Sequence, residues 1–252
     1  MTVYYFTSTG NCLSVAKMLG GNLVSISQEV KKNQIICKDD VVGIVFPVYG
    51  LCVPPIICDF LNRSDIQTNY LFAIATYGTF AGAVPYQLEQ CVGKKKKHFD
   101  YINTLHMQEN YLPGFAMEKQ KEPKNQKEKT KIIIQDIVTK KQYLKSTSWF
   151  ERFMTNAHLK NYKYNIGEGY TKSFGVMDIC IGCGQCEKLC PMGNVHIQEG
   201  KPVFETNCCS CFSCIQNCPQ KALQIEGEKG KGRYRNPDVT VAELIEANQY
   251  RR

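Results

Sequence analysis

Apolar residues in the N-terminal part of the chain form short, unbroken runs separated by turn residues and by segments with helical periodicity. Runs of this length without alternation are typical of strands that are buried on both faces. Such strands are predicted at 3–6, 41–46 and 71–76, with a weaker one at 99–107. Helices are predicted between them, over 12–19, 54–61 and 83–92. This alternation indicates an α/β fold, in which helices cover both faces of a parallel sheet.

The loops after the first three predicted strands are rich in hydroxyl groups, glycine and tyrosine. Their candidate ligand-binding residues are Thr7, Ser8, Thr9, Gly10, Asn11 and Cys12, then Pro47, Val48, Tyr49 and Gly50, then Thr76, Tyr77, Gly78 and Gly82. Because the carboxyl ends of parallel strands share one edge of a sheet, we expect these loops to converge on one ligand. Amides and hydroxyls at a helix start can bind a phosphate without a cation, although a simple helix cap uses the same residue types.

Several classes of protein are excluded or disfavoured. The first loop has neither Gly-Lys-Ser/Thr nor G-x-G-x-x-G, which excludes a nucleotide triphosphatase loop and disfavours a dinucleotide fold. An uncharged stretch over 41–58 contains Pro47, Pro54 and Pro55, so it cannot form one membrane-spanning helix. Because the N-terminus does not resemble a secretory signal, we expect a cytoplasmic protein with reduced thiols and no membrane span.

Nine of the 14 cysteines crowd into 180–218. Two segments there share the pattern C-x2-C-x2-C-x3-C-P, and the second follows the first by 28 residues. The first segment contains Cys180, Cys183, Cys186 and Cys190, and the second contains Cys208, Cys211, Cys214 and Cys218. Ile197 and Ile225 each follow the last cysteine of their segment by seven residues, so we expect two equivalent halves with matching strands.

This cysteine spacing suits cubane iron–sulfur clusters. Three thiolates on one tight loop can reach three irons of a cluster, while the fourth cysteine binds the cluster of the other half. The predicted ligands are Cys180, Cys183, Cys186 and Cys218 for one [4Fe-4S] cluster, and Cys208, Cys211, Cys214 and Cys190 for the other. Cys209 is not a ligand in this pattern. Two structural zinc sites of four thiolates each are the alternative, although zinc sites usually pair distant C-x-x-C knuckles.

Because of these two cysteine segments, residues 174–226 resemble the bacterial two-cluster ferredoxins. The segment Thr7-Ser8-Thr9-Gly10-Asn11 and the two loops after it resemble the FMN-binding loops of short-chain flavodoxins, a resemblance that covers 1–146. Cys12 departs from the family, because flavodoxins commonly have Thr or Ser there and a thiol is a weaker donor. The whole chain thus resembles the flavodoxin-ferredoxin fusions of anaerobes, the EFR-type ferrodoxins, which Arg233-Tyr-Arg-Asn-Pro also fits.

The resemblance implies a flavodoxin-like doubly wound parallel sheet joined to a smaller α+β two-cluster ferredoxin domain. The expected divisions are an FMN-binding domain at 1–146, an aromatic linker at 147–173, the ferredoxin domain at 174–226 and an extension at 227–252. A helix within 123–144 is expected to close the first domain, with Ile132, Ile133, Ile137 and Leu144 as its apolar residues. Trp149, Phe150, Phe153, Tyr162 and Tyr164 are expected to pack between the domains. Thr240 and Glu243 form a capping box that opens a docking helix with Val241, Leu244 and Ile245 on one face.

Charge is distributed unevenly along the chain. The net charge is +8, and because residues 177–226 carry −2, the remainder carries +10. Lys94 to Lys97 contribute four consecutive positive charges. Such a surface attracts acidic partners, and an acidic ferredoxin or reductase is the expected one, since no nucleic-acid motif accompanies the charge. A solvated surface without a partner remains the simpler interpretation.

These features predict an electron-transfer oxidoreductase with two [4Fe-4S] clusters and an FMN, which reduces a small-molecule electron acceptor or a redox protein partner. One alternative is a pure electron carrier between redox partners, without substrate chemistry. Another is a first domain that has lost its flavin and only docks partners. His106 and Cys52 are weak catalytic candidates. The cofactors could also meet across a homodimer.

Overall fold

In the computed structural model, residues 1–92, 98–161 and 171–249 are described. Contacts divide the chain into two compact units. The first comprises Met1–Phe6, Cys12–Gln108 and Glu122–Lys163, and the second comprises Thr7–Asn11, Glu109–Lys121 and Tyr164–Arg252. The short segment Thr7–Asn11 therefore belongs by its contacts to the second unit, although it lies between two elements of the first in the chain.

The first unit is built on a parallel sheet. Within the described residues this sheet has six strands in the order β2-β1-β4-β6-β7-β8. Their bounds are Thr2–Tyr5 for β1, Asn22–Ser25 for β2, Val41–Pro47 for β4, Tyr70–Tyr77 for β6, Tyr101–His106 for β7 and Tyr143–Leu144 for β8. A separate parallel pair joins β3, Ile35–Lys38, to β5, Ser64–Gln67. The four predicted strands are thus confirmed, and the strand order reverses between β1 and β4.

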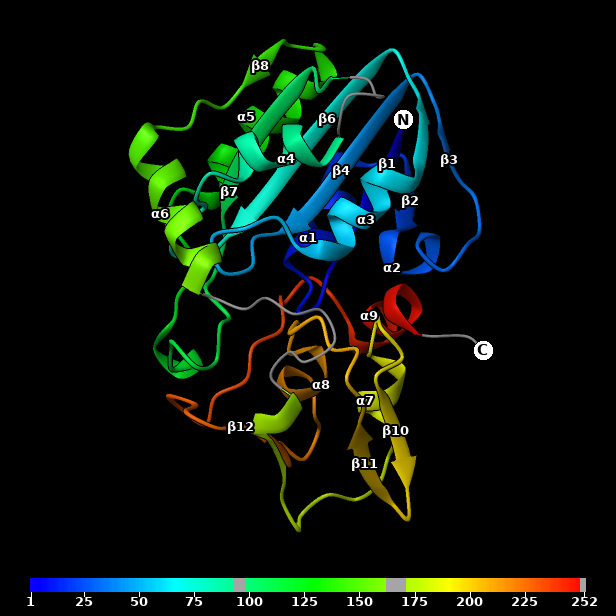
Figure 1. The fold of residues 1–252 in the computed structure, drawn as a ribbon, viewed down its shortest axis with the longest axis vertical. Coiled ribbons are helices and arrows are strands. Elements are labelled where there is room, and N and C mark those ends of the chain that lie inside the picture. Colours follow the sequence, from blue (N-terminus) through cyan, green and yellow to red (C-terminus); the bar gives the residue numbers. More distant parts are fainter. Residues whose placement is uncertain (93–97, 162–170, 250–252) are drawn as a thin grey trace. The chain divides into compact units, whose positions relative to one another are not determined.

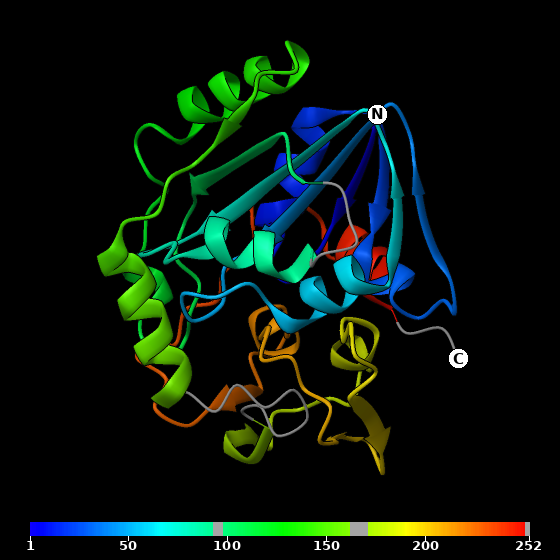
Figure 2. The same ribbon diagram turned by 45° about the horizontal axis from the view of Figure 1, so that its top comes forward.

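Helices cover both faces of this sheet, as Figures 1 and 2 show. One face carries α3, Pro55–Arg63, and α4, Val84–Val92, and the other carries α1, Asn11–Leu19, and α5, Gln126–Val138. The short α2, Ile26–Glu29, follows β2. Central strands are buried along nearly their whole length, which explains their unbroken apolar sequences. The α/β prediction is confirmed.

Two predictions for the end of this unit need correction. In α5, Ile133 and Ile137 are buried four residues apart, whereas Ile132 lies off this stripe and is 55% exposed. Leu144 belongs to strand β8 instead of the helix. The expected aromatic linker contains the helix α6, Trp149–Asn161, on which Trp149, Phe150 and Phe153 are exposed. Tyr162, Tyr164 and Lys94 to Lys97 lie outside the described residues.

A disulfide links Cys58 on α3 to Cys91 on α4, 33 residues apart in sequence. The expectation that the thiols of the protein are reduced is therefore wrong for this pair. Each cysteine alone looks like an ordinary small apolar residue of its helix, and only the packing of the two helices brings them together. Among the residues that the structure describes, no helix is long and apolar enough to cross a membrane.

The second unit contains two antiparallel strand pairs and short helices. One pair joins β10, Val195–Gln198, to β11, Lys201–Phe204, and the other joins β9, Phe174–Val176, to β12, Leu223–Ile225. The helices are α7, Gln185–Lys188, α8, Ser213–Gln216, and α9, Val241–Asn248, with single turns at Met117–Lys119 and Thr171–Ser173. Its apolar core includes Leu112, Phe212, Ile215, Leu223 and Tyr234.

The predicted capping box of α9 is present. The Thr240 hydroxyl accepts from the Glu243 amide at 3.2 Å, and the Glu243 carboxylate accepts from the Thr240 amide at 2.7 Å. The buried face of α9 differs from the prediction, because Leu244, Ala247 and Asn248 are buried while Val241 and Ile245 are only half-buried. A polar side chain, Asn248, therefore lies on the inner face of this helix.

Candidate functional site

The cysteine repeat of the sequence is a repeat of backbone structure. Helix α8 follows α7 by 28 residues, and β12 begins 28 residues after β10, so Ile197 and Ile225 lie in matching strands as predicted. Left-handed backbone also recurs at the same offset. The matched positions are Gly182 and Ser210, Gly184 and Phe212, Gly193 and Lys221, and Glu199 and Gly227. The two halves therefore share one conformation even where their residues differ.

The structure brings the cysteines together around two hollows within the described part of the chain. Cys180, Cys183, Cys186 and Cys218 line the first hollow, which Ile197 and Leu223 also border. Cys190, Cys208, Cys211 and Cys214 line the second, together with Cys209. The fourth cysteine of each segment thus lies at the hollow of the other segment.

The two hollows differ in their exposure to solvent. Cys183 is exposed at the first hollow, and the neighbouring Ile181 is 64% exposed. At the second hollow Cys190 and Cys214 are buried, and Phe212 is only 6% exposed. Among the described residues, no group of three His, Cys, Asp or Glu side chains is close enough to hold a single metal ion.

Backbone amides donate to several of these sulfur atoms. The Asn194 amide lies 3.2 Å from Cys190 Sγ, and the Ala222 amide lies 3.3 Å from Cys218 Sγ, at equivalent positions of the repeat. The Ser210 amide lies 3.3 Å from Cys208 Sγ. Hydrogen bonds of this kind favour the thiolate form, and in iron–sulfur proteins they help to set the reduction potential.

Burial opposes ionisation of several of the cysteines. It raises the pKa of Cys186 and of Cys190 to about 11, and it raises the pKa of Cys214 well above its usual value. A hydrogen bond from Cys209 lowers the pKa of Cys211 and raises that of Cys209 itself. Since only thiolates bind metal, a metal that enters these hollows must displace protons, and its binding energy must overcome this burial.

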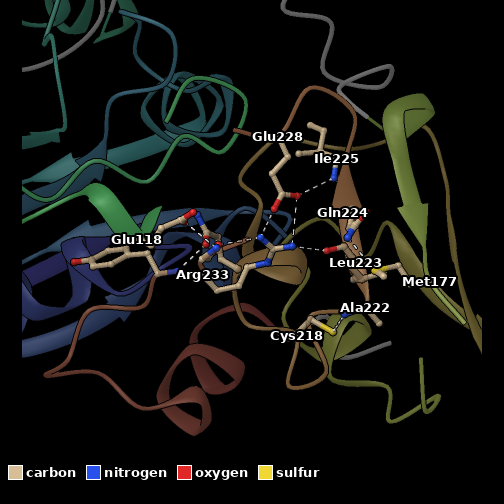
Figure 3. A network of polar contacts seen from close by, with 12 residues as sticks. Glu118, Met177, Cys218, Ala222, Leu223, Gln224, Ile225, Glu228 and Arg233 are labelled. Atoms are coloured by element: carbon tan, nitrogen blue, oxygen red, sulfur yellow. Dashed lines mark hydrogen bonds and ion pairs between the residues drawn. The ribbon is translucent and has the colours of Figure 1, made fainter. Parts of the chain in front are cut away.

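A buried ion pair beside Cys218 was not predicted from the sequence (Figure 3). The Arg233 guanidinium pairs with Glu228, and both side chains are nearly inaccessible, at 7% and 6%. Arg233 also donates to the Leu223 carbonyl of β12 at 2.9 Å. The Glu118 carboxylate accepts a hydrogen bond from the amide of Gly232, the residue before Arg233, at 3.0 Å. These contacts tie the segment that follows β12 to the core of the second unit.

The hydroxyl-rich segment Thr7–Asn11 is buried against other residues of the second unit. The Thr7 hydroxyl accepts from the Gly10 amide at 3.2 Å, and the Thr9 hydroxyl accepts from Asn110 Nδ2 at 2.6 Å. Each hydroxyl keeps its own hydrogen as a donor. Gly10 has φ of +99°, and a Cβ there would lie 2.9 Å from Val239, so both conformation and space require glycine. This tight turn retains donors suited to an anion.

The other two candidate loops lie side by side in the first unit. A Cβ on Gly82 would lie 2.4 Å from the Leu51 carbonyl oxygen, and the Val48 amide donates to the Thr76 carbonyl at 2.8 Å. Tyr77 stacks on His106, with ring centroids 5.2 Å apart. Glycine thus permits the close approach, and the loops form one edge of the sheet, at the carboxyl ends of β4 and β6.

Other side chains at this edge have partners of their own. Tyr49 packs edge-on against Phe6, with ring centroids 6.2 Å apart. The Cys12 thiol lies 3.1 Å from the Thr76 hydroxyl, and burial raises its pKa to about 12. The Cys52 thiol donates to the Gly50 carbonyl at 3.1 Å, and burial raises its pKa as well. The contacts of Cys12 and Cys52 are those of structural thiols.

Comparisons with known proteins match a small part of the chain. A ferredoxin of Pyrobaculum islandicum is 40% identical over 53 residues, which are 20% of this chain and 50% of that protein. The PorD component of pyruvate synthase from Methanothermobacter marburgensis is 36% identical over 58 residues, 23% of this chain and 69% of PorD. No family model matches the chain.

One component of an ion-translocating oxidoreductase complex from Methanosarcina acetivorans is 40% identical over 47 residues. This match covers 18% of each chain, so the chain spans about a fifth of that relative's length. The matches are about as long as the segment 174–226. One of these relatives is named as a ferredoxin, and the matches support electron transfer as the role of this region. Through a segment of about a fifth of its length, the chain belongs to the ferredoxin-type [4Fe-4S] proteins.

Proposed function

We propose that the protein is an electron-transfer oxidoreductase that carries two [4Fe-4S] clusters and an FMN in one chain. The observation that carries the proposal is the pair of hollows, each lined by the four cysteines predicted for one cluster, of which one comes from the other half of the repeat. This exchange of the fourth ligand is the arrangement of two-cluster ferredoxins. When bound, the clusters supply one-electron carriers and the FMN supplies a group that can hold two electrons.

The residues present fit the clusters. Cys180, Cys183, Cys186 and Cys218 would hold one, and Cys208, Cys211, Cys214 and Cys190 the other. The amides that donate to Cys190, Cys208 and Cys218 would stabilise the bound thiolates and tune their potentials. Zinc sites usually pair two C-x-x-C knuckles that lie far apart in the chain, whereas here three of the thiolates at each hollow come from one short loop. This spacing favours clusters over zinc.

The first unit supports a flavodoxin-like domain for FMN. In order along the chain, its sheet strands are arranged 2-1-3-4-5-6, and the first five follow the flavodoxin-like order, in which ligands bind at the carboxyl ends beside the switch point. Loops 47–52 and 76–82 leave the sheet at that edge and offer Tyr49 and Tyr77 for contact with a flat ring. The segment Thr7–Asn11, which belongs by its contacts to the second unit, resembles the phosphate loop of flavodoxins, and its Thr7 and Thr9 hydroxyls each keep a hydrogen to donate to a phosphate.

The partner of such a protein is proposed to be another redox protein or a small electron acceptor. Two of the relatives are named as subunits of larger assemblies, which supports work with a protein partner. The positive charge outside 177–226 favours an acidic partner at low salt. A partner that binds in this way would dissociate as ionic strength rises.

The test is a quantitative one on anaerobically prepared, reconstituted protein. We expect about eight irons, eight sulfides and one FMN per chain, with the flavin reduced when dithionite-reduced clusters are present in the same molecule. Zinc bound in place of iron, without sulfide, would contradict the clusters. Full iron without any flavin after denaturation would contradict the FMN.

A pure electron carrier is the second candidate, and one observation favours it. The two candidate catalytic side chains have structural partners, since His106 stacks on Tyr77 and Cys52 donates to the Gly50 carbonyl. A carrier should exchange electrons with redox proteins and show no turnover with quinones, flavins or nitro compounds. An oxidoreductase should turn over at least one of these small acceptors.

A further inference from the structure

Helix α8 connects the cysteine-lined hollows to the hydroxyl segment Thr7–Asn11. Cys214 on α8 lines one hollow, and Cys218, two residues beyond its end, lines the other. Two polar side chains of the same turn, Ser213 and Asn217, donate to the Ser8 carbonyl at 2.9 Å and 3.4 Å. These two side chains are 0% and 5% exposed, so both bonds are buried.

The carbonyls on either side of Ser8 are held in the same way. The Thr7 carbonyl accepts from Asn248 Nδ2 at 2.9 Å, and the Thr9 carbonyl accepts from the Asn236 amide at 2.8 Å. Asn248 and Asn236 are both buried. Three consecutive carbonyls of the segment, within the described structure, are thus paired with donors from α8 and from the chain after residue 233.

The side chain of Asn11, the last residue of the segment, also accepts buried hydrogen bonds. Asn11 Oδ1 accepts from the Tyr234 hydroxyl at 2.7 Å and from Asn236 Nδ2 at 3.1 Å. Carbonyl oxygens repel a phosphate, whereas amide and hydroxyl hydrogens attract it. These oxygens are engaged by buried donors, and the Thr7 and Thr9 hydroxyls keep hydrogens that they can donate to an anion.

We propose that Ser213, Asn217, Tyr234, Asn236 and Asn248 are positioning residues for the FMN phosphate, so that flavin affinity depends on cluster loading. The proposal rests on the proposed function. A helix of four residues is too short to be stable alone, and metal ligation at Cys214 and Cys218 would hold it in place. The coupling must be reciprocal, so bound FMN should also protect the clusters.

The test compares FMN affinity in the cluster-loaded and cluster-free full-length protein, measured by flavin fluorescence under anaerobic conditions. We expect the dissociation constant to rise about tenfold when iron is removed by a chelator. The reverse measurement is the rate of iron loss to the chelator, which should fall in the presence of saturating FMN. Neither measurement depends on catalytic turnover.

Variants of α8 isolate the proposed link. In Ser213→Ala/Asn217→Leu, the loaded protein should bind FMN about as weakly as cluster-free wild type, with full iron content and little further change when iron is removed. The control is Ser173→Ala, a serine of the same unit whose carbonyl accepts from the Glu226 amide, and it should behave like wild type. Tyr234→Phe keeps the buried ring and removes only the hydroxyl, so it remains informative if the double variant does not fold.

The outcomes separate this proposal from the proposed function. Equal FMN affinity with and without iron in wild type, or unchanged affinity in both Tyr234→Phe and the double variant, would overturn the coupling and leave the flavin in place. Absence of FMN binding in every form would instead overturn the flavin part of the proposed function.

Discussion

The two halves of the cysteine repeat adopt one backbone with different residues. At three of the matched left-handed positions the first half has Gly182, Gly184 and Gly193 and the second half has Ser210, Phe212 and Lys221, whereas at a fourth the first half has Glu199 and the second half has Gly227. A residue with a Cβ costs about 1–2 kcal/mol in this conformation. Phe212 is buried among the core residues of the second unit and lies near the rings of Tyr111 and Phe174.

The difference shows that one ligand geometry can be reached in two ways. Glycine makes three of these turns in the first half accessible without strain, and that half is the more exposed one. In the second half the burial of Phe212 and the Arg233–Glu228 pair beside β12 offset the strain. The second half is therefore held by its surroundings, and the first half mainly by its own turns and ligands.

The largest expected effect is on iron content. Cys186→Ser and Cys214→Ser should each lose about half of the iron, because each removes a ligand from a different cluster. Cys209→Ser, which changes a neighbouring thiol that is not a proposed ligand, should keep all of it. Iron and sulfide per chain measure the effect. Loss of iron in Cys209→Ser, or retention in the other two, would contradict the assignment of ligands.

The next largest effect concerns the buried Arg233–Glu228 ion pair, which we infer stabilises the second half of the repeat. Arg233→Met should destabilise the protein by about 3–5 kcal/mol, because it leaves the buried Glu228 carboxylate without its partner. Urea unfolding followed by circular dichroism measures the free energy. Arg235→Met is the control, since it removes a single hydrogen bond to the Val239 carbonyl and should cost about 1 kcal/mol. Equal losses of unfolding free energy in the two variants would show that the buried ion pair does not stabilise this half.

Exchange of residues between the halves should be unequal. Gly182→Ser should destabilise the protein by at least about 1–2 kcal/mol, because its φ is +64° and a Cβ would lie 2.7 Å from the Gly200 carbonyl oxygen. Ser210→Gly at the matching position should change stability by less than about 1 kcal/mol, since relief of strain offsets the added freedom of the unfolded chain. Thermal unfolding measures both, and similar costs would show that the halves are held alike.

The smallest effect is kinetic. In Cys214→Ser the remaining cluster would lie at the exposed first hollow, and in Cys186→Ser at the buried second one. A chelator should remove iron about three- to tenfold faster from the former, because local opening is easier where ligands are exposed. Loss of visible absorbance under anaerobic conditions follows the reaction. Equal rates would indicate that exposure in the structure does not govern access to the clusters.

The same contrast explains what could be predicted. The cysteine spacing predicted which thiols share a hollow, because the chain between the ligands is too short to allow many geometries. Unbroken apolar runs predicted the central strands, since burial on both faces demands such runs. The buried pair of Arg233 and Glu228 left no comparable pattern, because charged residues in a polar segment normally lie on the surface.

The outcome was different for residues whose roles depend on distant partners. The disulfide between Cys58 and Cys91 and the exposed aromatic helix α6 could not be read from their local sequences. The segment Thr7–Asn11 had a recognisable composition, but nothing in it indicated Ser213, Asn236 or Asn248 as partners. Hydrogen bonds across more than 200 residues have no sequence period, so only the folded chain reveals them.

The sequence by itself determined the class of the fold, the two sets of four cysteines and the cap of α9, because these depend on local spacing and on short-range hydrogen bonds. The tertiary structure decided which of those features are buried, which strained turns are tolerated and what holds the hydroxyl segment. These depend on packing between segments that are far apart in the chain, where the conformation of each residue is chosen by its neighbours in space.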